Sequence, residues 1–295
     1  MKRALRIAGI TVGTLLVAIA GFYLYADLHF KSELARTYSV PDISISHDVS
    51  TASLALGERI VRVRSGCAEC HGADLSGKAI IDDPAIGKVF SSNLTPFALA
   101  DKSDETIALA LRHGLRPNGT SLVFMPSYEY QNFSKSDIAV IIAYLRSVPS
   151  VEKQNTPIEI GPIGKMVYAV GKFPVLTPAA LVNHQPGFVT KPKEAATSEF
   201  GEYLVNSSCI GCHGKELKGG PVIGGAPDWP PAANLRFKGR AEWTEETFFK
   251  TMETGVSASS GKYLRLPMSV LVGRLDNKEL TAIWLYLSSL EQQAD

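Results

Sequence analysis

Two cysteines and a histidine lie within five residues of one another, at Cys67, Cys70 and His71. Three kinds of chemistry use this grouping. Thiolates and an imidazole are the usual ligands of structural zinc. Two cysteines separated by two residues can act as a redox dithiol, and the sequence Cys-x-x-Cys-His can attach a haem through two thioether bonds. The surrounding sequence has to decide among the three.

The motif returns once, at Cys209, Cys212 and His213. The similarity extends well beyond the cysteines, at an almost constant offset along the chain. The matching pairs are Leu75 with Leu217, Gly77 with Gly219, Asn93 with Asn234, Gly114 with Gly255, Met125 with Met268, and Tyr144 with Tyr286. A repeat of this length predicts two homologous domains, over residues 50–150 and 197–292.

Haem attachment explains the two motifs best. A structural zinc site would need four ligands, and neither domain has a second pair of cysteines or histidines near its motif. A dithiol of the thioredoxin kind would need a strand–helix–strand pattern, which is not evident. Two cysteines on one helical turn both reach the edge of a porphyrin, and the next histidine then points to the iron. The sequence therefore predicts two covalently bound haem c groups.

A methionine is expected to be the second axial ligand in each domain. Met125 and Met268 each adjoin a proline, at matching distances after the motif histidine. A thioether ligand suits iron and raises its reduction potential. The alternative role of a methionine is to fill the core. Met252 is assigned that role, because it matches Leu111 inside the middle helix of the repeat.

Three polar residues are further candidates for the site. His113 is the rival axial ligand in the first domain, but it lies near a helix end, where a capping role is favoured. Asn93 and Asn234 recur at matching positions, where they either bind haem propionates or stabilise a loop turn. The loop turn is favoured for both.

Helices are expected to position all these residues. A helix leads into each motif, and Gly57 and Gly201 would let it approach another segment closely. The periodicity of apolar residues predicts a middle and a closing helix in each domain, with little strand. These helices are expected to begin at the N-cap residues Ser103, Ser134, Thr244 and Asp276.

Residues 1–26 are expected to form a transmembrane anchor. Residues 7–26 carry no charged side chain and follow three basic residues, and a run of this length matches the bilayer core. Three aromatic residues close to position 25 suit the outer membrane interface. The alternative is a secretory signal, for which Ala18-Ile19-Ala20 would be the cleavage site. Either way, the domains lie on the outer side of the cytoplasmic membrane.

Residues 151–196 are rich in proline and are expected to form a stiff linker. One part of it predicts a short helix beginning near Pro162. The helix carries an apolar stripe and is expected to pack against one of the two domains rather than against a partner or the bilayer. The stripe consists of Ile163, Met166, Val167 and Val170.

The chain resembles a known family through the segments SSNLTP, RHGLRPNGTSLVFMPSYEY and IIAYLRSVP. They are similar to the cytochrome subunits of membrane-bound alcohol and gluconate dehydrogenases. The resemblance implies an all-α fold, with two tandem class I cytochrome c domains preceded by one N-terminal transmembrane helix. It also implies electron transfer from a periplasmic dehydrogenase or similar donor to the respiratory chain. That family typically carries three haem domains, whereas this chain has two and an anchor.

The function expected is that of a membrane-anchored di-haem electron carrier rather than an enzyme. A formal net charge of +1 gives no reason to expect nucleic acid as a partner. The first alternative is a di-haem subunit of a haem–copper terminal oxidase. The second is a di-haem enzyme, either a peroxidase or a thiosulfate-oxidising enzyme. An enzyme would need an open or unusual sixth iron position, which the repeated methionine disfavours.

Overall fold

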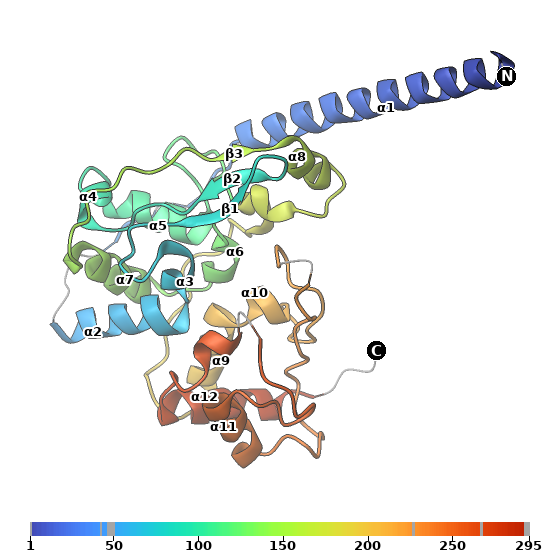
Figure 1. Cartoon of the computed structure of the whole chain (residues 1–295). Coiled ribbons are helices and arrows are strands. Elements are labelled where there is room, and N and C mark those ends of the chain that lie inside the picture. The colour runs from blue at the N-terminus through green and yellow to red at the C-terminus, as the bar shows by residue number, and fades with distance from the viewer. Residues whose placement is uncertain (1, 42, 46–50, 226–227, 266–267, 292–295) are drawn as a thin grey trace.

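The computed structural model describes residues 2–41, 43–45, 51–225, 228–265 and 268–291. This part of the chain is mostly helical. Helix α1 (Lys2–Ala35) extends away from the rest of the molecule as a single long arm (Figure 1). Its most apolar window has a mean hydropathy of 2.1 and none of it is buried, so by length and composition the helix suffices to cross a bilayer.

The first unit packs its helices around one apolar core, which includes Ile60, Phe133 and Ile138. Helix α2 (Thr51–Arg59) continues into the π-helical turn η1 (Ile60–Arg64) and crosses the closing helix α7. The remaining helices of this unit are α3 (Cys67–His71), α4 (Pro96–Leu99), α5 (Asp104–His113), α6 (Ser127–Tyr130) and α7 (Lys135–Ser147).

The second unit repeats this arrangement around a core that includes Phe200, Leu204 and Leu287. Its first helix crosses its closing helix, as α2 crosses α7 in the first unit. The helices are α9 (Ser198–Ser208), α10 (Ile210–His213), α11 (Glu245–Thr254), the 3₁₀ turn η4 (Met268–Leu271) and α12 (Asn277–Ser289).

Glycines allow the close helix crossing in both units. A Cβ atom at Gly57 would overlap the carbonyl oxygen of Val140 on α7. A Cβ atom at Gly201 would overlap the carbonyl oxygen of Ala282 on α12. The close backbone approach predicted for these two glycines is therefore confirmed.

The predicted starts of the middle and closing helices are also confirmed. Each N-cap side chain accepts a hydrogen bond from the backbone N–H three residues later. In the second unit the N3 side chain completes a capping box at both helices. The four caps are Ser103, Ser134, Thr244 and Asp276.

The prediction of an all-α fold missed a small antiparallel sheet in the first unit. Strands β1 (Ala79–Asp83) and β2 (Gly87–Phe90) form a hairpin, and β3 (Glu159–Ile160) adds to β2. The hairpin turn is stabilised by Asp83, whose Oδ1 accepts hydrogen bonds from two amides in the turn. The third strand comes from the linker, so sequence periodicity near the motif did not reveal the sheet.

The linker contains the expected short helix, α8 (Pro162–Ala169), followed by the 3₁₀ turns η2 (Pro174–Leu176) and η3 (Pro178–Leu181). It does not run freely between the units, because much of it packs on the first one. The Phe124 amide donates to the Val175 carbonyl at 3.1 Å. Helix α8 lies between α1 and the β1–β2 hairpin (Figure 1).

Candidate functional site

Each Cys-x-x-Cys-His motif occupies a single turn of helix. The first forms α3, and in the second, Cys209 is the residue from which α10 begins. The histidines are almost fully buried, at 7% exposed for His71 and 4% for His213. Cys67 and Cys209 are half-buried against the cores of their own units. The two sequence motifs are thus presented by the same local structure.

Both motif histidines are oriented by a backbone carbonyl. The Nδ1 atom of His71 lies 2.7 Å from the Ser92 carbonyl oxygen, and that of His213 lies 2.7 Å from the Ala233 oxygen. A carbonyl can only accept, so Nδ1 carries the proton and Nε2 keeps its lone pair for a metal. These hydrogen bonds alone would raise the pKa of both histidines, but burial lowers it by more. The lowered pKa favours the neutral imidazole, which is the form that binds a metal.

The backbone after each histidine follows the same unusual path. Leu75 and Leu217 have positive φ angles of 61° and 58°, which leucine rarely adopts. Two residues farther on, an amide donates to the carbonyl of the motif histidine, at 2.7 Å in the first unit and 2.9 Å in the second. A strained conformation that recurs in both units indicates that the surrounding structure holds these histidines in place.

The state of the thiols argues against the other two chemistries. No disulfide joins the four cysteines, and burial raises the pKa of Cys67, Cys209 and Cys212 to about 12. Protonated thiols are poor nucleophiles, unlike those of redox dithiols. The described residues also contain no group of three or more metal-binding side chains of the kind that zinc needs.

The two candidate methionines lie in the same unit as the motif that each would serve. Met125 packs against the core that Cys67 also contacts, and Met268 packs against the core that Cys209 contacts. Met268 begins η4, directly after two residues outside the described chain. Met252 is 7% exposed in the core of the second unit, as predicted for a core residue.

The other polar candidates have structural partners. His113 was expected to cap its helix, and this is wrong: it is 1% exposed and its Nδ1 lies 3.0 Å from Nδ1 of His184 in the linker. Asn93 stabilises a loop as predicted, because its Nδ2 donates to two linker carbonyls and its Oδ1 accepts from an amide. Asn234 is exposed and accepts from the Arg236 amide at 2.8 Å.

Sequence analysis missed Glu129, which lies between the two motifs. It is part of α6, and a Cβ atom at Gly211 would overlap its side chain. Its charge acts on the thiols of Cys70 and Cys212, one from each motif. Burial raises the pKa of Glu129 from 4.5 to about 7. Because the two units pack together here, no local pattern in the sequence distinguishes this glutamate from an exposed one.

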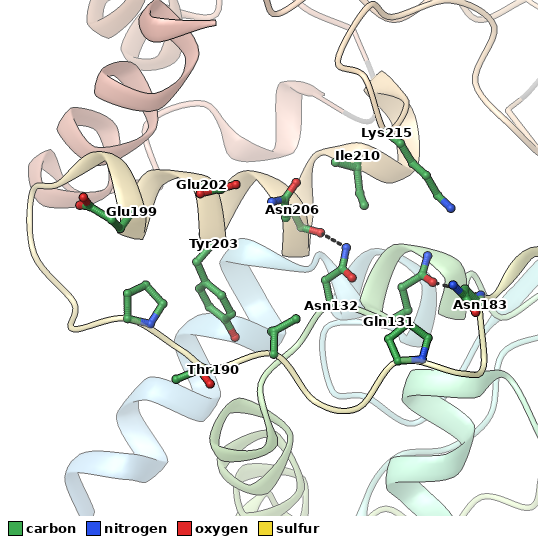
Figure 2. Close-up of a pocket in the computed structure, with 13 residues that line it drawn as sticks. Gln131, Asn132, Asn183, Thr190, Glu199, Glu202, Tyr203, Asn206, Ile210 and Lys215 are labelled. Atoms are coloured by element: carbon green, nitrogen blue, oxygen red, sulfur yellow. Dashed lines mark hydrogen bonds between the residues drawn. The ribbon is translucent and has the colours of Figure 1, made fainter. Parts of the chain in front are cut away.

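An open cavity of about 550 Å³ lies beside this contact, between the linker and α9 (Figure 2). Asn132 crosses from the first unit and donates to the Asn206 carbonyl at 3.0 Å. Ile210 lines both this cavity and a smaller one of about 180 Å³, which also includes Cys212. The second motif therefore borders a cavity between the units.

Comparison with known families identifies both units. Residues 54–149 match the family described as cytochrome c. Residues 196–287 match the family described as cytochrome c oxidase, cbb3-type, subunit III. The chain carries two cytochrome c domains. A cytochrome c domain implies covalently bound haem c, and the thiols and the free Nε2 described above provide a fitting set of donors.

Two curated relatives of these cytochrome c domains are components of dehydrogenases. One component of the nicotinate dehydrogenase of Pseudomonas putida is 29% identical over 264 residues, which cover 82% of this chain and 22% of the relative. The fructose dehydrogenase cytochrome subunit of Gluconobacter japonicus is 24% identical over 260 residues, covering 79% of this chain and 52% of the relative. The chain thus spans about a fifth and about half of their lengths.

Proposed function

We propose that this protein is a membrane-anchored di-haem cytochrome c that relays electrons and has no substrate chemistry of its own. The observation that carries the proposal is the duplicated motif geometry. In both domains a buried histidine is fixed through Nδ1 to a backbone carbonyl and keeps Nε2 for a metal. The proposed division is an anchor over residues 1–26, domains over 50–150 and 197–292, and a linker over 151–196.

Each domain would hold its haem with four side chains. His71 and His213 would bind iron through Nε2, and Met125 and Met268 would each supply it with a thioether ligand. Bound iron supplies reversible one-electron chemistry, and the protein tunes the potential through burial and axial ligands. The thioether bonds would form at Cys67, Cys70, Cys209 and Cys212.

The favoured partner is a dehydrogenase on the outer side of the cytoplasmic membrane. Both curated relatives carry names of dehydrogenase subunits. Electrons would enter from such a donor and leave to a respiratory acceptor. The second candidate is a subunit of a haem–copper oxidase, because residues 196–287 match a family of cbb3-type oxidase subunits.

Absorption spectroscopy of the haem-loaded protein tests the ligand assignment. We expect two low-spin haems, a ferric far-red band from methionine ligation at each, and no binding of carbon monoxide. Met125→Leu or Met268→Leu should each remove about half of the far-red band and open one haem to carbon monoxide. Met252→Leu is the matched control, since this buried methionine is proposed to pack only against the core.

Two outcomes would contradict the proposal. A wild-type haem that is high-spin or binds carbon monoxide would revive the peroxidase-type enzyme. An unchanged far-red band in both methionine variants would refute the assigned ligands. Co-purification from native membranes separates the two partner classes, because an oxidase would bring copper and non-covalent haem with it.

A further inference from the structure

Helix α8 leaves the two ends of its apolar stripe exposed. The helix is held on the first domain by its other face, through Gly164 and Tyr168, both of which are buried. A Cβ atom at Gly164 would overlap the Ile86 carbonyl oxygen, so the contact with the β1–β2 hairpin is close. The two ends of the stripe are exposed, Ile163 at 50% and Val170 at 56%, whereas Met166 and Val167 between them are half-buried. The expectation that this helix packs against a domain is confirmed, but Ile163 and Val170 of its apolar stripe lie outside that contact.

Helix α8 runs beside α1 and in the same direction. Lys165 Nζ lies 2.6 Å from Asp27 Oδ1. Three residues farther along both helices, the Tyr168 and Phe30 rings meet edge to face with centroids 5.3 Å apart. The second contact lies three residues after the first on both helices. The first turn of α8 therefore lies beside the α1 residues just before Asp27. Those residues form the outer end of the uncharged segment of α1.

A second isoleucine lies at this same end. Ile86, in the hairpin turn, is 39% exposed. The Ile163 amide donates to the carbonyl of Ala85, the residue before Ile86, at 2.8 Å. This hydrogen bond joins the hairpin turn to the first turn of α8. We call Ile86 and Ile163 the isoleucine pair. Val170 lies a further seven residues along α8, or about 10 Å farther from the span at the helical rise.

The charged groups near the pair allow contact with lipid headgroups. Asp83 already accepts two turn amides, and Lys165 already pairs with Asp27. Lys88 and Asp82 are exposed and of opposite sign, so they give the surface no strong preference for anionic lipid. An apolar tip with a mixed polar border is typical of a surface at the headgroup boundary.

We propose that the isoleucine pair inserts into the lipid interface of the membrane that α1 crosses. Lipid is the proposed contact because the pair lies beside the outer end of α1, and α1 is an apolar helix suited to the bilayer. The first domain would then contact the membrane at two places, the anchor and the pair, and this would fix its orientation. The inference rests on the membrane anchoring in the proposed function.

Site-directed spin labelling of the full-length, haem-loaded protein tests this contact. In the haem-loaded protein the native cysteines are consumed by thioether bonds, so an added cysteine can be labelled alone. The variants are Ile86→Cys, Ile163→Cys, Val170→Cys and Leu24→Cys, each reconstituted in phosphatidylcholine vesicles. Accessibility to oxygen, which concentrates in lipid, is compared with accessibility to a water-soluble nickel chelate.

We expect the labels at positions 86 and 163 to be several-fold less accessible to the nickel chelate than the label at 170. The label at 24 reports on the anchor. If it lies in lipid while 86 and 163 behave like 170, the inference is overturned and the anchor stands. If the label at 24 is instead accessible to the water-soluble nickel chelate, α1 does not anchor the protein in the membrane, and the inference fails as well. Equal shielding of 86, 163 and 170 from both reagents would indicate a protein cover, such as a second copy, and would also overturn the inference.

Discussion

At the scale of single residues, both motif histidines take their orientation from a backbone carbonyl, and Glu129 takes its burial from packing between the domains. The two motifs and their methionines were evident from the repeat alone. The carbonyls of Ser92 and Ala233, which orient the histidines, were not, because any residue can supply a carbonyl. Glu129 was missed for a different reason: its burial depends on packing between domains, which a local pattern does not record.

Glu129 should make stability depend on pH. Its pKa of about 7 lies above the ordinary 4.5, so the folded protein holds this proton more tightly than the unfolded chain does. The contribution of this group to the free energy of unfolding should therefore be highest below pH 4.5, decrease between pH 4.5 and about 7, and level off above that range. The slope for one proton is at most about 1.4 kcal/mol per pH unit.

Glu129→Gln should remove this slope, so that the variant gains stability relative to wild type at pH 8 but not at pH 4.5. Urea unfolding of the haem-loaded protein at several pH values measures the effect. Glu202→Gln is the control, since this carboxyl is exposed on the neighbouring cavity. Parallel pH profiles for wild type and Glu129→Gln would contradict the prediction.

At the scale of elements, the helices were predictable because their signals are local. Caps and apolar periodicity lie within a few residues of the helices they specify. The β1–β2–β3 sheet was not predictable, because its third strand is recruited from the linker. The packing of α8 on the first domain was predicted, but its packed residues Gly164 and Tyr168 were not, because they lie outside the apolar stripe.

The crossing glycines should tolerate no side chain. Gly57→Ala and Gly201→Ala each place a Cβ atom onto a backbone carbonyl of the partner helix, which cannot rotate away. We expect each to lower the free energy of unfolding by about 2–3 kcal/mol, even after the better helix propensity of alanine. Gly187→Ala is the control, because no atom lies within 4 Å of a Cβ there. Thermal or urea unfolding measures the difference, and equal stability of all three variants would contradict it.

At the scale of the whole molecule, the two domains are joined by ion pairs that no repeat analysis could reveal. Glu279 on α12 is fully buried and binds Arg59 and Arg64 of the first domain. Its place in a capping box was visible in the sequence, but its partners lie more than 200 positions away. A second link joins Tyr203 on α9 to Asp137 on α7. The linker alone therefore does not set the relative position of the domains.

Glu279 should be the most sensitive point of this junction. Glu279→Ala removes the carboxylate 2.6 Å from the Arg64 side chain, which is 4% exposed, and leaves that of Glu194 at 3.8 Å, so we expect a loss of about 3 kcal/mol. Glu291→Ala is the matched control, because Glu291 is 77% exposed in its pair with Lys238 and should cost less than about 1 kcal/mol. Urea unfolding gives the energies, and faster proteolysis within residues 183–193 should report loosened docking.

The same carboxylate predicts how the junction responds to acid. Burial alone would raise the pKa of Glu279, but the hydrogen bonds and charges of Arg59 and Arg64 outweigh it and hold the pKa below its ordinary value. Its contribution is therefore complete above pH 4.5 and is lost as pH falls through the lowered pKa. Wild type should become susceptible to linker proteolysis in that acidic range, whereas Glu279→Ala should already be susceptible at neutral pH. If the two proteins resist protease equally at pH 7, the domains are held together by other contacts, and this carboxylate is not what joins them.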